Sequence, residues 1–422
     1  MKEDLLYFVW KNHCFPTSLQ TTDQQALTIF NTGFRNERAG ADFEMVKIQI
    51  DGVQWVGNVE IHTKASDWEA HQHHKNEHYQ NVILHVVWEA DKVIFNAEKK
   101  RIPTLELKNY VPPQILEKYK ILMRQTAQIP CEKYFPEVPS LLKTNMIDTA
   151  LVQKLEKKAH KLKDTLIQTQ YDWEYTTYTV LMRNFGFANN AEPMEQLAQR
   201  LPLKHIQKHT DQPFQVEALL LGMAGFLQDK NNKNEPEYLQ KLQKEYQFLA
   251  HKYDLSGKEL NPLIWQTGRI RPANAPKLRL AQIATLFCQI PHFFSFCLHT
   301  EIPEFLKKIQ ITPSSFWQQN HAAHKLGKES QMNILINTII PILVLYADEK
   351  QEEHYKEKAL QMLEQLPKEE NSLTKIWLNI GLKPKNAAES QGLIEWYKNF
   401  CQPKKCATCK IGAHLLKNTN PL

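Results

Sequence analysis

The sequence predicts an α/β or α+β domain with a mixed sheet at the N-terminus, followed by a larger all-α domain. Strand-like runs are confined to about the first 110 residues, where 43–50 alternates apolar and polar side chains and 81–88 is almost continuously apolar. From about Pro112 onward, apolar residues recur at helical spacing. Glycine is scarce, at 13 of 422 residues, which disfavours an all-β chain. The domains are therefore expected at 1–125 and 126–422.

The N-terminal domain is expected to contain one helix and up to five strands. Leu5, Phe8 and Val9 lie on one side of an amphipathic helix. Asp51-Gly52 is a strong hairpin signal between two of the strands. The expected elements are a helix at 1–11, strands at 43–50, 53–63 and 81–88, and short strands at 93–96 and 103–107. The polar segment at 66–79 is expected to be helical or irregular.

The helical domain shows its periodicity most clearly at 216–227, 334–346 and 354–366. Gly222 and Gly225 lie in the first of these segments and would allow close packing of helices. We find no clear repeat of 20 to 50 residues along the chain, so a solenoid is not supported.

The composition favours a folded protein that does not cross a membrane. The most apolar stretch, 339–347, contains Pro341 and is far shorter than the about 20 residues that a membrane span requires. The N-terminus is acidic where a signal peptide is basic, so we expect a cytoplasmic location. A net charge of +6 permits nucleic-acid binding without requiring it. Seven cysteines, an odd number, argue against a disulfide framework.

Acidic side chains are expected to converge at one end of the predicted hairpin. Asp42 immediately precedes the first strand, and Glu60 and His62 lie two residues apart on the second, on one face of the sheet. Two carboxylates this close repel each other unless a cation lies between them. The pattern predicts a Mg²⁺ or Mn²⁺ site that activates water for attack on phosphorus. The alternative is that Asp42 caps a turn and Glu60 is solvated.

This arrangement resembles the PD-(D/E)xK phosphodiesterase superfamily, whose core has a helix, a strand pair bearing Asp and then Glu-x-Lys, a helix and a further strand. Ala41-Asp42 corresponds to the first element, with Ala in place of the usual Pro. Glu60 and His62 correspond to the second, with His in place of Lys. An imidazole lacks the fixed positive charge of an ammonium group.

The resemblance implies a nuclease-like fold and a Mg²⁺- or Mn²⁺-dependent nuclease acting on nucleic acid. Asp42 and Glu60 would hold the metal ion, and His62 would take the place of the lysine. Lys64, on the same strand, would contact phosphate. Glu3, on the first helix, lies where some members of the superfamily carry a further acidic ligand.

A second candidate site is the histidine-rich segment. His71, His74 and His78 have helical i, i+3, i+7 spacing and, with Asp67, predict a Zn²⁺ or other transition-metal site. That site would suit a transition-metal hydrolase. The alternatives are a hydrogen-bonded helix edge, or a segment that cradles phosphate or orients Glu60. His85, in an apolar strand, is expected to be a core histidine.

A third candidate site lies near the C-terminus. Cys401, Cys406 and Cys409 form a C-x4-C-x2-C pattern flanked by lysines, which stabilise thiolates. Candidates for a fourth ligand are His414, Cys131 and Cys14. A histidine would complete a zinc site, and a fourth cysteine would complete a [4Fe–4S] site. The alternative is a tail with free thiols.

Basic segments of the helical domain are candidates for phosphate binding. Arg269, Arg271 and Arg279 lie in a proline-containing loop before an apolar helix, and 154–163 carries five lysines. Both would hold a nucleic-acid backbone with an affinity that falls as salt rises. The alternative for the loop is a structural clasp that pairs with carboxylates such as Glu217.

Several longer runs resemble the bacterial family catalogued as domain of unknown function 2851. They include AGADF, VGNVEIHTKASDWEAHQHHKNEHYQNVILHVVW, IPTLEL, EALLLGMAGFL, RIRPANAPKLRLAQIA and the terminal cysteine cluster. This resemblance extends over nearly the full length but implies no activity, so the nuclease hypothesis depends on the site residues. The rival hypothesis is a non-catalytic nucleic-acid- or protein-binding scaffold on a nuclease-like fold, which the replacement of the lysine supports.

Overall fold

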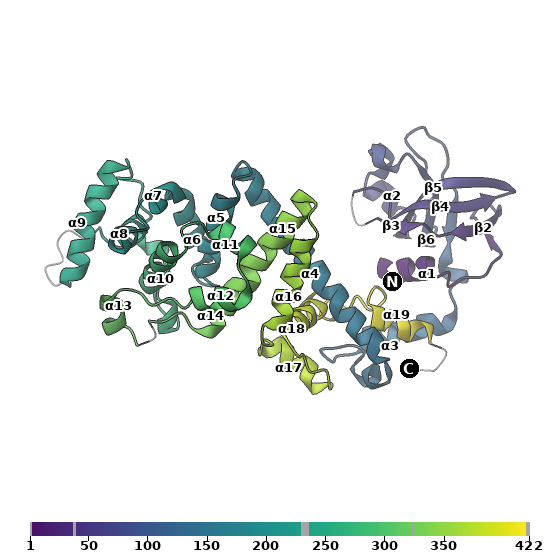
Figure 1. Ribbon diagram of the computed structural model, residues 1–422. Helices are drawn as coiled ribbons and strands as arrows, with labels where there is room; N and C mark the ends of the chain where they lie inside the picture. The colour runs from purple at the N-terminus through teal and green to yellow at the C-terminus, as the bar shows by residue number, and fades with distance from the viewer. Residues whose placement is uncertain (1, 37–38, 229–235, 323, 419–422) are drawn as a thin grey trace. The chain divides into compact units, whose positions relative to one another are not determined.

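The computed structural model describes residues 2–36, 39–228, 236–322 and 324–418, and the chain forms two compact units (Figure 1). Unit 1 comprises Met1–Ala150, Glu370–Lys383 and Gly392–Leu422. Unit 2 comprises Leu151–Glu369 and Pro384–Gln391. This division differs from the predicted boundary at 125. The last segment of the chain, with its cysteines, returns to the unit that contains the sheet.

Unit 1 contains a mixed seven-stranded sheet with the order β1-β2-β4-β5-β6-β7, in which β3 pairs with β4. The strands are β1 (Leu19–Gln20), β2 (Ala26–Asn31), β3 (Phe34–Arg35), β4 (Phe43–Ile50), β5 (Val53–Lys64), β6 (Val82–Glu89) and β7 (Thr104–Glu106). Neighbours from β1 to β5 are antiparallel, whereas β5, β6 and β7 are parallel. The predicted mixed sheet is confirmed.

The hairpin of β4 and β5 forms where the sequence predicts it. Asp51 and Gly52 both have positive φ, 46° and 84°, as a tight hairpin turn with matching twist requires. The strand predicted at 93–96 is wrong, because Phe95 makes only an isolated bridge to Arg101. Strands β1, β2 and β3 were not predicted.

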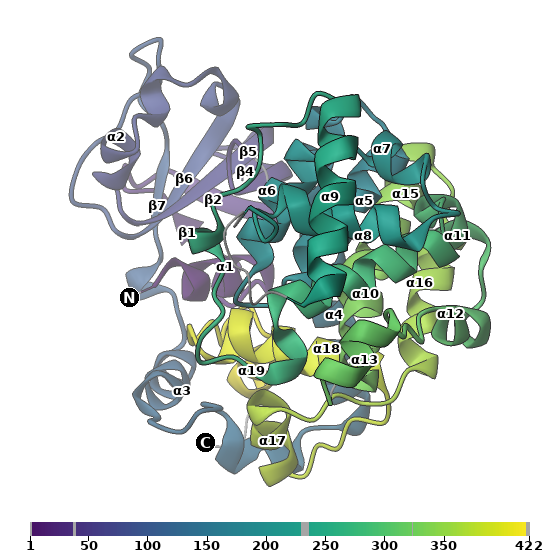
Figure 2. The ribbon, with the colours of Figure 1, turned by 90° about the vertical axis from the view of Figure 1, so that its left-hand side faces the viewer.

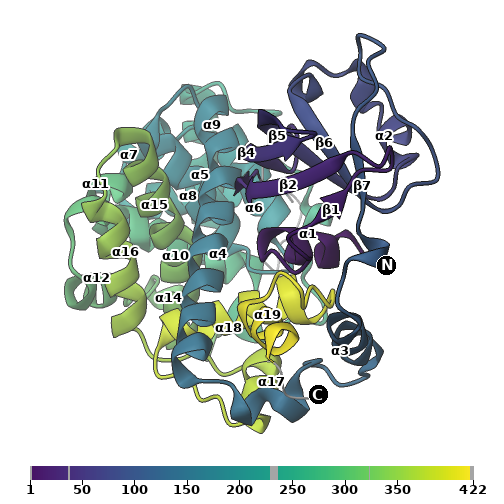
Figure 3. The ribbon, with the colours of Figure 1, turned by 90° about the vertical axis from the view of Figure 1, so that its right-hand side faces the viewer.

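Helices of unit 1 pack on the sheet and on one another. They are α1 (Glu3–Lys11), α2 (Asp67–Ala70), α3 (Pro113–Arg124), η4 (Glu132–Glu137), α17 (Ser372–Asn379), the π-helical turn η8 (Tyr397–Cys401) and α19 (Lys410–Lys417), with parts of α4 (Ser140–Gln168) and α18 (Ala387–Trp396). Helix α1 packs against β5 because it buries Leu5, Leu6 and Val9. Helix α19 lies beside α3 (Figure 3).

The core of unit 1 joins side chains that are far apart in the sequence. The ring centroids of Trp377 and Trp396 are 4.4 Å apart, and that of Phe135 is 6.1 Å from each. Leu5 and Leu415 are buried in the same apolar cluster. The sheet therefore shares one core with the end of the chain.

Unit 2 is helical, as predicted. It contains parts of α4 and α18 and the short 3₁₀ turns η5 (Pro262–Ile264) and η6 (Pro272–Asn274). Its other helices are α5 (Trp173–Phe185), α6 (Ala191–Arg200), α7 (Leu203–Gln207), α8 (Pro213–Met223), α9 (Glu237–Lys252), α10 (Pro276–Gln289), α11 (Phe293–His299), α12 (Ile302–Lys308), α13 (Ser315–Asn320), α14 (Lys328–Ile334), η7 (Leu335–Ile339), α15 (Ile340–Lys350) and α16 (His354–Gln365). Helices α9 and α10 both pack on α8 (Figure 2). Gly222 of α8 faces the ring of Tyr246 on α9, and a Cβ there would lie 2.1 Å from that ring.

One helical stretch is long and apolar enough to cross a membrane. Helices α14, η7 and α15 run without a break from Lys328 to Lys350, although Pro341 lies within this stretch. The π-helical turn η7 ends just before the proline, where the missing N–H interrupts regular hydrogen bonding. In the apolar window of this stretch, 72% of the residues are buried inside the structure, as in the core helix of a globular domain.

Candidate functional site

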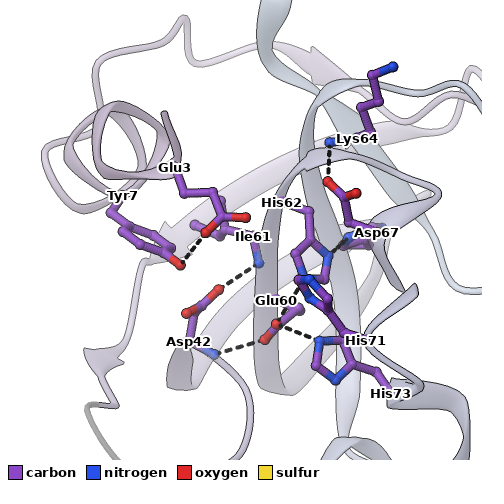
Figure 4. Close-up of polar contacts among 11 residues, drawn as sticks. Glu3, Tyr7, Asp42, Glu60, Ile61, His62, Lys64, Asp67, His71 and His73 are labelled. Carbon is purple, nitrogen blue, oxygen red and sulfur yellow. Dashed lines mark hydrogen bonds and ion pairs between the residues drawn. The ribbon is translucent and has the colours of Figure 1, made fainter. Parts of the chain in front are cut away.

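The β4–β5 hairpin brings Asp42 and Glu60 together. Phe43 pairs with Val59, so the residue before β4 lies opposite the acidic residue of β5. The Asp42 backbone N–H donates to Glu60 Oε2 at 3.0 Å, and the Ile61 N–H donates to Asp42 Oδ2 at 2.9 Å (Figure 4). Each carboxylate is thus fixed by the backbone of the other strand.

Burial makes both carboxylates weak acids. Desolvation, together with repulsion from Glu60, raises the pKa of Asp42 to about 7. Desolvation, together with repulsion from Glu3, raises the pKa of Glu60 to about 8. Hydrogen bonds from the backbone oppose both shifts. A divalent cation beside the pair would remove the reason for the raised pKa values, because it stabilises the charged forms.

Helix α1 adds Glu3 and Tyr7 to the acidic side of the site. The Tyr7 hydroxyl donates to Glu3 Oε2 at 3.5 Å and also hydrogen-bonds Asp42. The Arg35 guanidinium lies 4.7 Å from the centre of the Tyr7 ring. Our sequence analysis missed Tyr7, although its i, i+4 spacing from Glu3 places both residues on one helix face.

His62 lies on the other side of Glu60, among imidazoles. Its side chain is buried, with Nδ1 2.9 Å from His85 Nε2 and Nε2 3.2 Å from His71 Nδ1. His62 Nε2 is 3.4 Å from Glu60 Oε1, and His73 Nε2 is 3.3 Å from the same oxygen. Desolvation, reinforced by nearby imidazoles, lowers the pKa of His62 to about 2, so the ring is neutral. His62 therefore supplies no fixed positive charge.

The predicted helical set of His71, His74 and His78 is wrong, because helix α2 ends at Ala70. Gln72 adopts a left-handed conformation with φ of 59°, and short 3₁₀ turns, η1 (His73–Lys75) and η2 (Glu77–Tyr79), follow. This turn directs His71 and His73 toward His62 (Figure 4).

His62, His71 and His73 each bring one potential ligand atom within 4.8 Å of the others, the only such trio of Asp, Glu, His or Cys among the described residues. The candidate metal site therefore contains His73 and not the predicted His74. Asp67 lies outside the trio, since its Oδ2 accepts from the Lys64 backbone N–H at 3.0 Å.

Two other site residues have roles that differ from or refine the prediction. The Lys64 side chain is exposed and points away from Asp42 and Glu60 (Figure 4), whereas the sequence placed it with them at the phosphate. His85 is fully buried, as predicted for a core histidine, but its Nε2 also holds His62.

The cysteines of the C-terminal pattern meet Cys131 in unit 1. Cys131, Cys401, Cys406 and Cys409 are all buried in one apolar cluster, and their proximity helps raise the pKa of the Cys131 and Cys401 thiols. The backbone N–H groups at the start of α19 point to the Cys409 sulfur. All are free thiols. No three of them approach within 4.8 Å among the described residues, which is wider than a zinc site requires.

The other two candidates for the fourth position are Cys14 and His414, which join no group of three potential ligand atoms within 4.8 Å among the described residues. Cys14 lies near Lys417, which lowers its pKa against the larger effect of burial. His414 is within α19, where its carbonyl accepts from the Asn418 N–H at 3.0 Å.

The arginine loop of unit 2 does not present all three predicted phosphate ligands. Arg279 is only 3% exposed, and its guanidinium donates to Gln282, Asn274 and Ser330. It is therefore a structural residue. Arg269 and Arg271 are exposed.

The alternative clasp with Glu217 is also wrong. Glu217 accepts instead from the indole of Trp317 and the hydroxyls of Tyr238 and Ser314. Lysines of the 154–163 face are engaged inside unit 2: Lys158 donates to Asn337 Oδ1 at 2.7 Å, and Lys163 pairs with Glu349 at 2.8 Å.

The chain belongs to the family described as "Protein of unknown function (DUF2851)", which matches residues 3–372. The matched region contains the Asp42–Glu60 pair, the imidazole trio and Cys131. It ends before the three C-terminal cysteines. No curated protein and no solved structure matches the chain.

Proposed function

We propose that this protein is a metal-dependent phosphodiesterase that cleaves nucleic acid at the Asp42–Glu60–His62 site. The observation that carries the proposal is the pair of carboxylates, buried at Glu60 and half-buried at Asp42, each fixed by the backbone of the other strand. Burial raises the pKa of both acids, so near neutral pH a cation beside them favours the state in which both are ionised. Mg²⁺ or Mn²⁺ is the expected ion, because it prefers carboxylate oxygens.

The order of elements supports the same proposal. Helix α1, the β4–β5 hairpin, helix α2 and strand β6 occur in the order implied by the resemblance to the PD-(D/E)xK superfamily, with strands β1, β2 and β3 inserted between α1 and β4. Asp42 stands before the first strand of the hairpin, and Glu60 and His62 lie in the second. Glu3 lies on the helix that packs against β5.

The side chains divide the chemistry between them. Asp42 and Glu60 hold the cation, which polarises the phosphodiester and lowers the pKa of a bound water. His62 orients the attacking water through a neutral imidazole nitrogen beside Glu60 Oε1. The excess of 52 basic over 46 acidic residues favours a polyanionic substrate, and binding weakens as salt rises.

Cleavage of single- and double-stranded nucleic acid by the purified full chain with Mg²⁺ or Mn²⁺ tests this function. Glu60→Gln and Asp42→Asn should each abolish cleavage, because they remove the charge that holds the cation while keeping the side-chain shape. Glu44→Gln is the matched control, since Glu44 is an exposed carboxylate on β4 of the same hairpin. Cleavage that survives Glu60→Gln would place the chemistry elsewhere.

The second candidate function is a non-catalytic scaffold that binds nucleic acid or protein. The observation that favours it is at the position of the superfamily lysine, where His62 is neutral, while Lys64 points away from the carboxylates. Salt-sensitive binding of nucleic acid without cleavage, across substrates and metals, would support the scaffold.

We also propose that Cys131, Cys401, Cys406 and Cys409 ligate a metal centre that stabilises unit 1. Four buried thiols in one cluster support this proposal. Zinc at about 2.3 Å from each sulfur needs sulfurs about 3.8 Å apart. The wider spacing of the thiols favours a [4Fe–4S] cluster over zinc.

A further inference from the structure

We infer that His62, His71 and His73 form a binding site for a divalent transition-metal ion such as Zn²⁺, with Glu60 Oε1 beside His62 and His73. This site lies on the imidazole side of Glu60, whereas the cation of the proposed phosphodiesterase lies on the Asp42 side. The two sites lie on either side of Glu60 and share His62 Nε2, so an ion on the imidazoles excludes the orientation of water by that nitrogen. Metal binding by the imidazoles does not depend on phosphodiesterase activity.

The separations between the potential ligand atoms match a small coordination sphere. Zn²⁺ binds imidazole nitrogen and carboxylate oxygen at about 2.0–2.2 Å, so two ligands of a tetrahedral ion are about 3.3–3.5 Å apart. The His71 Nδ1 to His62 Nε2 distance is 3.2 Å. The distances from Glu60 Oε1 to His62 Nε2 and His73 Nε2 are 3.4 and 3.3 Å.

The surrounding residues orient the imidazoles for ligation. His85 Nε2 lies 2.9 Å from His62 Nδ1, so a His62 ring protonated at Nδ1 directs the lone pair of Nε2 toward the site. Metal-binding histidines commonly have such an outer partner on the second ring nitrogen. The His73 ring is stacked between His62 and Tyr79, at centroid distances of 5.2 and 3.9 Å.

His73 Nε2 is a buried nitrogen in need of a partner. The His73 side chain is only 10% exposed, and its Nε2 makes no hydrogen bond of acceptable geometry with any described residue, although Glu60 Oε1 is 3.3 Å away. Leaving such an atom unpaired costs about 1–3 kcal/mol. A metal ion held by His62, His71 and His73 would give this nitrogen a partner.

The site is open on one side, because His71 is exposed. An ion can therefore enter and exchange from solvent. Imidazole nitrogen selects transition metals over Mg²⁺, which prefers oxygen ligands.

The test is a titration of the metal-stripped full chain with Zn²⁺, measured by isothermal titration calorimetry. Wild type should bind one Zn²⁺ more per chain than the His71→Ala/His73→Ala variant. The cysteines are common to both proteins, so the difference reports the imidazole site. His71→Ala alone changes an exposed residue and should lower the affinity by at least about 100-fold, more than the typical loss of an outer partner.

His78→Ala is the matched control, since His78 is an exposed histidine of the same segment outside the trio. It should bind Zn²⁺ as wild type does. Equal stoichiometry and affinity in wild type and the double variant would overturn the inference. Zn²⁺ binding without cleavage under any condition would leave this site standing while the proposed function fails. Mg²⁺-dependent cleavage by a wild type that does not bind the extra Zn²⁺ would support the proposed function and overturn the imidazole site.

Discussion

Asp42 holds Glu60 through its backbone rather than its side chain: the Asp42 N–H donates to Glu60 Oε2 at 3.0 Å. The same carboxylate presents Oε1 to His62 and His73. Glu60 therefore joins the acidic and the imidazole sides of the site, and a single substitution at Glu60 affects both.

His62→Lys should separate the two metal preferences of the site. A protonated ammonium cannot ligate an ion, so the variant should lose the extra Zn²⁺. The same ammonium supplies the positive charge that the PD-(D/E)xK pattern has at this position, so Mg²⁺-dependent cleavage should be kept or rise. Calorimetry and a cleavage assay measure the two effects. His62→Leu is the control and should lose both. If His62→Lys abolishes cleavage as His62→Leu does, His62 takes part in the reaction as an imidazole.

Loss of a C-terminal thiol ligand should remove a metal centre and destabilise unit 1. Cys131→Ser and Cys406→Ser should each reduce bound iron and sulfide, bleach absorbance at about 400 nm and lower Tm. Cys14→Ser is the control, because Cys14 is only half-buried, at the margin of the apolar cluster and near Lys417. Elemental analysis and thermal melts measure these changes. If the wild type contains neither iron nor zinc after anaerobic purification, the proposed metal centre is wrong and the four cysteines are free thiols.

Glu217 should make stability fall as pH rises. Burial, opposed by hydrogen bonds from Trp317, Tyr238 and Ser314, raises its pKa from 4.5 to about 7. Below pH 4.5 both the folded and the unfolded protein carry the proton. Between pH 4.5 and 7 the unfolded protein releases it first, so the free energy of unfolding decreases by about 3 kcal/mol.

Glu217→Gln removes this titration. As pH rises from 4.5 to 7.5, the free energy of unfolding of the variant minus that of wild type should therefore increase by about 3 kcal/mol. Urea melts at several pH values measure the difference, and Glu304→Gln, at an exposed glutamate of α12, is the control. A difference between Glu217→Gln and wild type that does not change with pH would show that Glu217 stays ionised in the fold.

Gly222→Ala should destabilise unit 2. The added Cβ would lie 2.1 Å from Cδ2 of Tyr246, a ring fixed by a hydrogen bond from its hydroxyl to Glu259 at 2.8 Å. Helices α8 and α9 would have to separate, at a cost of about 1–3 kcal/mol or more. Gly268→Ala is the control, since no heavy atom lies within 4 Å of the Cβ position there. Equal Tm values for the two variants would contradict the close packing of α8 on α9.

The pairing of Asp42 with Glu60 could be predicted only in part. The alternating side chains of β4 and the Asp51-Gly52 turn specify the hairpin register as far as Val46, which pairs with Gly57. A bulge between Phe43 and Val46, where Met45 has a positive φ of 56°, then shifts the register by one residue and places Asp42 opposite Glu60. His73 could not be predicted in the same way. Its position depends on the left-handed Gln72, and a positive φ at a residue other than glycine leaves little trace in a sequence.

Which segments of the chain make up unit 1 could not be predicted from local patterns either. Cys131 meets Cys406, and Phe135 meets Trp396, only after the chain has passed through unit 2. Strands β1 and β3 have two residues each, too few for an alternating pattern. Only tertiary contacts stabilise such short strands. The same holds for the position of the C-terminal segment, which the sequence alone assigned to the helical domain.

The discontinuity of unit 1 has a consequence for its biosynthesis. Residues 1–150 leave the ribosome long before Trp377, Trp396 and Leu415, which belong to the same core. At about 5–20 residues per second, the wait for the remaining residues is roughly 15–50 s. During this interval the nascent sheet exposes the apolar surface that the C-terminal segment later covers. Protection of that surface by a chaperone during translation should therefore decide the yield of folded protein.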